Sequence, residues 1–218
     1  MRDMLQFSGL PAGTPELPSK VNCVMPDDPY HTLKSQIAWH NPYYAVREDT
    51  VRYPDGSVGS YAVIEKPPSV FIVPLLDDGH MVLIHTYRYP LRRWEWEVPA
   101  GHVEPGQSLE DAARAELLEE IGGRAESFVS VGSFATTPGY GMEEAHVFLA
   151  QHVTLGPPQP EASEAIERHI VPLRRALYMA LFGQMSDGPS SLAILRTIPF
   201  LPDGKYLIAD VIASAARK

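Results

Sequence analysis

The segment PAGHVEPGQSLEDAARAELLEEIGG, residues 99–123, decides the fold of this chain. Ser108 followed three residues later by Asp111 is typical of a capped helix start, and the closing pair of glycines is typical of a helix end. We therefore predict a helix over residues 109–121, directly after a tight glycine-containing loop.

Three glutamates, Glu116, Glu119 and Glu120, fall on roughly one side of this helix, because each helical residue advances by about 100°. Crowded carboxylates raise one another's pKa unless a cation compensates their charge. Mg²⁺ is the ion we predict, with Mn²⁺ as the alternative, because it takes oxygen ligands and bridges to phosphates. The helix run alone also fits a solvated acidic surface, and the preceding loop favours the metal site.

The loop and helix resemble the signature motif of the Nudix hydrolases. The positions that match its spacing are Gly101, Glu116, Leu117, Glu119, Glu120 and Gly122. Three positions depart from the motif: Gln107 replaces a Glu, Ala115 replaces an Arg and Gly123 replaces a hydrophobic residue.

The change at residue 115 removes a guanidinium that would pair with Glu119 one turn later. Arg114 is turned by about 100° from that position, and we predict that it faces Glu110 or Leu118 instead. Gln107 keeps the size and hydrogen bonding of a glutamate but drops one negative charge.

The resemblance spans residues 38 to 196 and is strongest to the ADP-ribose pyrophosphatase branch. It implies an α/β fold, the Nudix-type α/β/α sandwich with a mixed β-sheet, preceded by a small N-terminal β subdomain that pairs across a homodimer. It also implies that Pro138 marks a preference for ADP-ribose. The implied metal ligands are Ala100, through its carbonyl, together with Glu116, Glu119, Glu120 and Glu143.

Further site residues follow from the same resemblance and from the chemistry of pyrophosphate. Glu143 is expected to act as general base on water or as a metal ligand, alongside Glu119 and Glu120. Arg88 is expected to contact a phosphate, with an ion pair to Glu97 as the alternative. Tyr140, Trp94 and Trp96 are candidates for stacking on a base, although Trp96 equally fits the core.

The predicted activity is Mg²⁺-dependent hydrolysis of a nucleoside diphosphate linked to a sugar, ADP-ribose first, which would give AMP and ribose 5-phosphate. Another nucleotide sugar or a dinucleotide is the near alternative. The contrasting alternative is a Nudix-fold nucleotide-binding protein with little or no catalysis, because Ala115 replaces the motif arginine.

The composition of the chain restricts the classes of partner that it is expected to bind. The 218 residues carry a formal net charge of −9, which argues against a nucleic-acid-binding surface. No apolar run is long enough to span a membrane, and the single cysteine, Cys23, fits a cytoplasmic protein. The eight histidines show no zinc-type spacing along the chain.

We predict four regions: a Pro-rich arm over residues 1–36, poorly ordered or draped on the surface, an N-terminal β subdomain over 37–67, a Nudix domain over 68–200 and a C-terminal tail over 201–218. Strands are expected in a hairpin around Asp55–Gly56, in a second pair over 69–76 and 80–88, and at 128–134 and 145–152. Residues 156–167 are expected to form a solvated loop, with its acidic end near the site as the less favoured alternative. Further helices are expected over 173–182 and 190–196.

Overall fold

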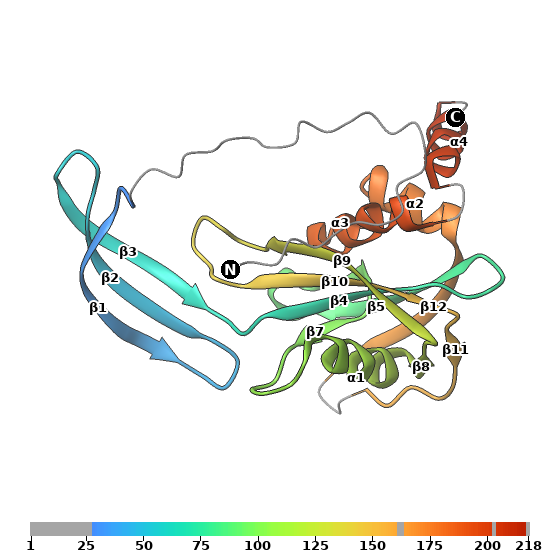
Figure 1. The fold of residues 1–218 in the computed structure, drawn as a ribbon, viewed down its shortest axis with the longest axis horizontal. Helices are drawn as coiled ribbons and strands as arrows, with labels where there is room; N and C mark the ends of the chain where they lie inside the picture. The colour runs from blue at the N-terminus through green and yellow to red at the C-terminus, as the bar shows by residue number, and fades with distance from the viewer. Residues whose placement is uncertain (1–27, 161–163, 202–203, 217–218) are drawn as a thin grey trace, which may run out of the picture.

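A computed structural model describes residues 28–160, 164–201 and 204–216 of the chain (Figure 1). The strands are β1 (His31–His40), β2 (Ala45–Arg52), β3 (Val58–Glu65), β4 (Ser69–Pro74), β5 (His80–Arg88), β6 (Arg93–Glu97), β7 (Ala100–His102), β8 (Gly123–Arg124), β9 (Ser127–Ala135), β10 (Glu144–Gln151), β11 (Thr154–Leu155) and β12 (Ile166–Pro172). The helices are α1 (Leu109–Ile121), α2 (Leu173–Leu181), α3 (Gly188–Thr197) and α4 (Gly204–Ala215), with short 3-10 helices at Tyr89–Leu91 and Ile198–Phe200. None of the helices in these ranges is long and apolar enough to cross a membrane.

Two sheets form the centre of the molecule. One has the strand order β7-β4-β10-β9, and the other has the order β12-β5-β6. The β4–β10 pair is parallel, whereas the other pairs in these two sheets are antiparallel, so the sheet structure is mixed.

Helices cover both faces of these sheets. On one face, α1 contributes Ala112, Ala113, Leu117 and Ile121 to a buried cluster with residues of β4, β5 and β10. On the other face, α2, α3 and α4 pack on alternate residues of the same strands. This arrangement is the α/β/α sandwich that the resemblance implied, and β4, β5 and β10 present apolar side chains to both sides.

A separate three-stranded antiparallel sheet, β1-β2-β3, stands beside the sandwich (Figure 1). The β2–β3 hairpin turns at Asp55–Gly56, as predicted, and Gly56 has a positive φ of 85°. Every residue of β1 is exposed, although β1 pairs with β2 along its length. The sheet therefore lacks a covering layer on this outer strand within the described chain.

Helix α1 begins and ends where its capping residues predict. The Ser108 hydroxyl accepts a hydrogen bond from the backbone N–H of Asp111 at 3.1 Å, and Gly122 closes the helix in a left-handed conformation. Glu110 and Asp111 in the first turn also favour the positive end of the helix dipole. These local signals fix the position of every glutamate on the helix.

The C-terminal end of α1 is also held by tertiary contacts. Arg168 on β12 donates to the carbonyl of Ile121 at 2.6 Å and to that of Gly156 at 2.7 Å. The N–H of Gly156 in turn donates to the carbonyl of Gly122 at 2.8 Å. Helix α1 is thereby fastened to the segment that leads into β12.

The predicted pairing of residues 69–76 with 80–88 is wrong. Strands β4 and β5 lie in different sheets, and the segments are joined only beside the turn, by a bridge between Leu75 and Met81 and a hydrogen bond from the Leu76 N–H to the His80 carbonyl. The turn after Leu76 matches the prediction, but both strands are buried on two faces and take other partners. A turn signal between two apolar runs cannot distinguish a hairpin from a corner between sheets.

Two further predictions for the fold need correction, whereas strands β9 and β10 and helices α2 and α3 are confirmed. The predicted arm extends to residue 36, but β1 begins at His31; residues 1–27, which include Cys23, lie outside the described range. The predicted loop over 156–167 ends at Ile166, where β12 begins. Helix α4 lies within residues 201–218, the region predicted as a C-terminal tail. The limits of the four predicted regions stay a prediction.

Replacing Gly122 by alanine should lower the free energy of unfolding by more than replacing Gly106. Both glycines have a positive φ, which costs an L-residue about 1–2 kcal/mol. A Cβ at Gly122 would also lie 2.4 Å from the carbonyl oxygen of Gly156, whereas a Cβ at Gly106 meets nothing within 4 Å. Urea denaturation of both variants gives the comparison, and equal losses would contradict the proposed docking of the helix end.

Candidate functional site

The Glu120 carboxylate is the most buried acidic group on α1, with only 5% of the residue exposed. Its Oε2 accepts a hydrogen bond of 2.9 Å from the backbone N–H of Ala100, the first residue of β7. A residue 20 positions earlier in the chain therefore meets α1 through its backbone.

Glu116 lies one turn before Glu120 and faces the same short strand. A Cβ built on Gly101 would lie 1.7 Å from Glu116 Oε1, so the carboxylate occupies the space that any side chain at residue 101 would need. Gly101 is thus required for close approach of the helix carboxylate to the strand backbone.

The two carboxylates influence each other electrostatically. Burial, and after it the charge of Glu116, raises the pKa of Glu120 well above the usual value for a glutamate. The negative charge of Glu164, just before β12, acts in the same direction, whereas the hydrogen bond from Ala100 opposes it. The less favoured expectation that the acidic end of 156–167 lies near the site is therefore supported at Glu164.

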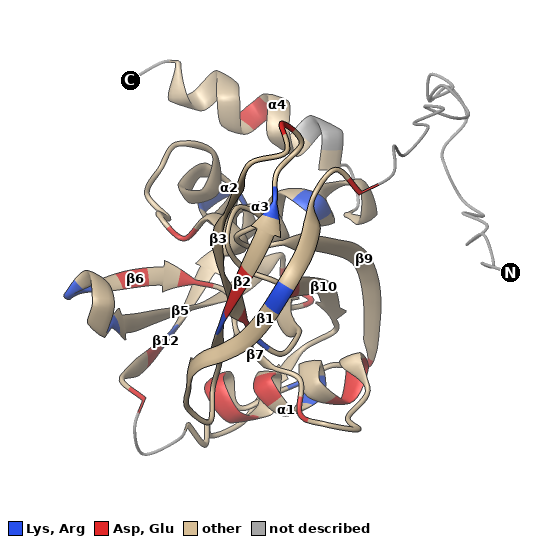
Figure 2. Ribbon diagram, turned by 90° about the vertical axis from the view of Figure 1, so that its left-hand side faces the viewer, with Lys and Arg blue, Asp and Glu red and all other residues tan. Residues whose placement is uncertain are grey.

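Glu119 and Arg114 lie on more exposed parts of α1 than Glu120. Glu119 is exposed, and its carbonyl accepts a 2.7 Å hydrogen bond from the N–H of Gln159. Arg114 pairs with Glu110, as predicted, with its guanidinium over the ring of Phe128. Figure 2 shows the acidic residues spread along α1.

A hollow of about 450 Å³ lies next to Ala115, lined also by Arg114, Arg124 and Phe128. It is on the flank of α1 rather than at the acidic pair. The small side chain at residue 115 contributes to this opening, and Arg114 does not take the place of the missing motif arginine.

Arg88 and Glu97 form an ion pair across β5 and β6. Arg88 Nε donates to Glu97 Oε1 at 2.7 Å, and its Nη2 donates to Oε2. The Glu97 side chain is 4% exposed, whereas that of Arg88 is 49% exposed. The ion pair with Glu97, which the sequence left open as the alternative role of Arg88, is therefore present. A phosphate contact by the exposed part of Arg88 stays a prediction.

Glu143 ends the loop between β9 and β10 and is held from two sides. Its Oε2 accepts hydrogen bonds from Lys66 Nζ at 3.0 Å and from the Thr136 hydroxyl at 2.9 Å. Burial acts to raise its pKa, but the hydrogen bonds from Lys66 and then Thr136 bring the pKa below the usual value. Glu143 is therefore an ionised acceptor at neutral pH.

His102, at the end of β7, connects Glu143 to the strand beside the acidic pair. Its Nε2 lies 3.8 Å from Glu143 Oε1. Burial, together with the positive charge of Lys66, lowers the pKa of His102, which favours a neutral imidazole. Oε1 of Glu143 is thus the oxygen directed toward β7.

The loop that carries Pro138 and Tyr140 is fastened to β3. The N–H of Ile64 donates to the carbonyl of Tyr140 at 2.7 Å, and the Tyr61 hydroxyl donates to the carbonyl of Gly139 at 2.6 Å. Pro138 and Tyr140 are exposed, so their side chains are available to a ligand.

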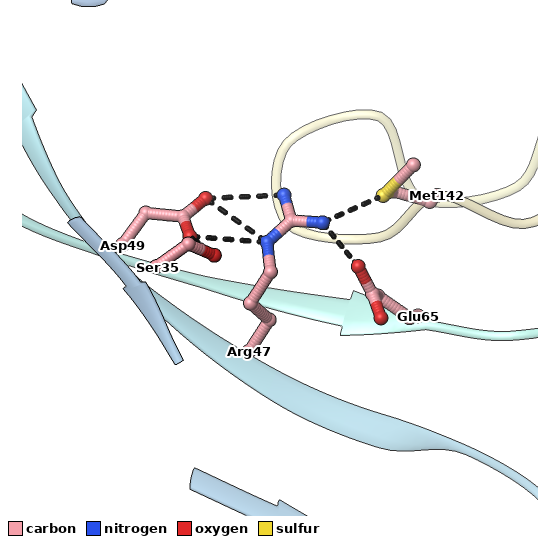
Figure 3. A network of polar contacts seen from close by, with 5 residues as sticks. All are labelled: Ser35, Arg47, Asp49, Glu65 and Met142. Carbon is pink, nitrogen blue, oxygen red and sulfur yellow. Dashed lines mark hydrogen bonds and ion pairs between the residues drawn. The ribbon is translucent and has the colours of Figure 1, made fainter. Parts of the chain in front are cut away.

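Arg47 on β2 supplies a polar connection at the same junction (Figure 3). It pairs with Asp49, at 3.1 Å from Nε to each carboxylate oxygen, and with Glu65 at the end of β3. Its Nη1 also lies 3.6 Å from the sulfur of Met142, the residue before Glu143. Neither Arg47 nor Lys66 was identified from the sequence, since a single basic residue in a strand or beside prolines gives no recognisable pattern.

The acidic pair fits a hard divalent cation. Its donors are oxygens, which Mg²⁺ and Mn²⁺ prefer. Glu120 is buried beside a second carboxylate, an arrangement that is costly when both are ionised unless a positive charge compensates. The available ligands on the described residues are therefore Glu116 and Glu120, with Glu119 at the exposed side of the same helix.

Comparisons with known proteins identify the family of this chain and support its fold. The NUDIX domain family matches residues 65–189, and the nucleoside diphosphate sugar hydrolase N-terminal domain matches residues 30–64. An ADP-ribose pyrophosphatase of Bacillus subtilis is 30% identical over 148 residues, which cover 67% of this chain and 80% of that protein. An ADP-ribose pyrophosphatase of Mycobacterium tuberculosis is 31% identical over 143 residues, covering 65% and 69% respectively.

Among solved structures, an ADP compounds hydrolase has the same fold, with a TM-score of 0.71 at 20% sequence identity. The match covers 80% of this chain and 95% of that one. It therefore includes most of the described elements.

Replacing Arg88 by glutamine should destabilise the fold by about 1–3 kcal/mol, because Glu97 then stays buried without its charged partner. Burial already raises the pKa of Glu97, so protonation favours the folded state. The loss of folding stability in the variant should therefore become smaller as the pH falls from 7 toward about 5. Urea denaturation measures it, with Arg88→Gln/Glu97→Gln as the matched control; a double variant no more stable than the single one would contradict this account.

Proposed function

Because this chain is a hydrolase of the Nudix family, we propose that it cleaves the pyrophosphate bond of ADP-ribose, giving AMP and ribose 5-phosphate. The observation that carries the proposal is the buried Glu120 beside Glu116, both held against the backbone of β7. Similarity to two ADP-ribose pyrophosphatases supports the choice of substrate. Other nucleoside diphosphate sugars are the near alternatives.

We propose Mg²⁺ as the ion, held by Glu116 and Glu120, with the Ala100 carbonyl and Glu119 completing the protein ligands and Mn²⁺ as a substitute. When bound, a divalent cation would neutralise charge on the phosphoryl oxygens and lower the pKa of an attacking water. Glu120 contributes a carboxylate whose orientation is already fixed by the Ala100 N–H. Less reorganisation is then needed at the reacting phosphorus.

Glu143 is the proposed general base. Its Oε2 is occupied by Lys66 and Thr136, which leaves Oε1, on the side of His102, to accept a proton from water. As water adds to phosphorus and the bridging P–O bond breaks, that proton passes to Glu143 and the departing phosphate keeps the bond electrons. A ligand role for Glu143 is the alternative.

Substrate contacts are proposed at Arg88, Pro138 and Tyr140. Arg88 is anchored by Glu97 but has an exposed side, from which it can meet a phosphate oxygen. Tyr140 is 55% exposed on the loop held by β3, where its ring can stack on a base. Glu97 acts by orienting Arg88.

Glu120→Gln and Glu116→Gln should each reduce hydrolysis of ADP-ribose in Mg²⁺ by at least about 100-fold. Loss of one carboxylate weakens binding of the cation and also disturbs its position at the reacting phosphate. Chromatographic resolution of AMP and ribose 5-phosphate measures the reaction. The matched control is Glu110→Gln, which removes an exposed carboxylate from the same helix.

Ala115→Arg tests the alternative that the incomplete motif binds a nucleotide without turnover. If the wild type releases no product but this variant does, catalysis was lost with the motif arginine. Product from the wild type that persists in Glu120→Gln would instead contradict the proposed site.

We further propose that the chain forms a homodimer through the β1-β2-β3 sheet. Exposed apolar side chains gather there, among them Leu33, Ile37, Trp39, Tyr44 and Val58. Strand β1 is also an edge strand with one unpaired side in the described chain, which favours association with another chain.

Light scattering should therefore give a mass of about twice 24.1 kDa for the wild type. Ile37→Glu, at a residue 51% exposed on β1, should yield a monomer, because a charge would be buried in the interface. Ile212→Glu is the matched control, since Ile212 is also 51% exposed but lies on α4. A wild type that is monomeric at micromolar concentration would overturn the proposal.

A further inference from the structure

His85, Glu167 and His169 come together on the sheet face opposite α1. Their side chains offer ligand atoms that all lie within 4.8 Å of one another. In the register of β5 and β12, Glu167 stands directly opposite His85, and His169 follows two residues later on the same face. Residues 84 positions apart in the sequence are thus adjacent, which spacing along the chain does not reveal.

This cluster is separate from the acidic pair on α1. His169 is paired in register with Leu83, which belongs to the cluster beneath α2 and α3. The neighbouring Ile84 belongs instead to the cluster beneath α1. Since alternate residues of a strand point to opposite faces, the two groups of ligands lie across the sheet from each other.

The distances suit a small tetrahedral ion. Glu167 Oε2 lies 3.5 Å from His169 Nε2 and 3.9 Å from His85 Nδ1. A tetrahedral ion with bonds of about 2.0–2.2 Å separates its ligand atoms by about 3.3–3.6 Å. The Glu167 side chain is 59% exposed and can rotate toward His85, and the two imidazoles would also have to move closer together, since the ligand atoms of the cluster are separated by up to 4.8 Å.

Two features prepare the imidazoles for a ligand. The ring of His85 stacks on that of Trp96 at a centroid distance of 4.5 Å, and Trp96 packs edge-on against His169 at 4.8 Å. His169 Nε2 is a buried atom without a hydrogen-bond partner. A buried polar nitrogen in that position is costly unless something satisfies it, and a cation would.

We propose that His85, Glu167 and His169 form a Zn²⁺ site distinct from the hydrolytic centre. Two imidazoles and one carboxylate are a known zinc ligand set, whereas Mg²⁺ prefers oxygen alone. The bound ion joins β5 to β12, the strand whose Arg168 holds the end of α1. Zinc therefore links the outer strand β12 to β5, the central strand of this sheet.

The test is zinc affinity, measured by competition with a chromogenic chelator on chelator-stripped protein in excess Mg²⁺, which keeps the α1 carboxylates occupied. His85→Gln and His169→Gln should each lower the affinity for one equivalent of zinc by at least about tenfold. His146→Gln is the matched control and should leave it unchanged, because His146 also lies near a glutamate, Glu144 at 4.0 Å, but outside this cluster. Zinc binding that is equal in all four proteins overturns the proposal.

Crystals of the wild type soaked in Zn²⁺ give an independent result if a variant fails to fold. An anomalous peak between the three side chains supports the site, and its absence at saturating zinc contradicts it. Neither experiment depends on hydrolysis, so the zinc site is tested separately from the proposed activity.

Discussion

The hydrogen bond from the Ala100 N–H to the buried Glu120 carboxylate is the contact on which the site depends. It joins a helix to a three-residue strand, and it works only because α1 is fixed at both ends. Ser108 fixes the start, and Gly122 with Arg168 fixes the end. Without these constraints, a carboxylate that is costly to bury would turn toward water. The free energy of folding thus holds the Glu120 carboxylate in a buried position, where a bound cation can compensate its negative charge.

The N-terminal sheet contributes to the same site from the other side. Lys66 follows β3 directly and binds Glu143, while Arg47 connects β2 and β3 to the sulfur of the preceding residue, Met142. The loop between β9 and β10 is therefore held by contacts from a separate sheet rather than by its own hydrogen bonds alone. In the proposed mechanism, this explains how a long surface loop can present a base at a defined position.

Local signals made the helix and the turns predictable, whereas partners distant in sequence were not. Capping residues located α1 within one residue at each end, and the Asp55–Gly56 turn located the hairpin of β2 and β3. The β4–β5 pairing was wrong because both strands are apolar on two faces, so the pattern does not specify a partner. Glu116 and Glu120 followed from helical spacing, whereas the histidine cluster depends on the register of β5 and β12, and the role of Lys66 depends on a contact with Glu143, 77 residues later in the chain.

The central claim is that Glu116 and Glu120 share a divalent cation beside Ala100. Anomalous diffraction from crystals soaked in Mn²⁺ locates that cation directly, since Mn²⁺ takes the same oxygen ligands as Mg²⁺. The account predicts a peak within bonding distance of both carboxylates, at about 2.0–2.3 Å, that is lost in crystals of Glu120→Gln. Saturating Mn²⁺ with no peak between these two side chains would contradict it.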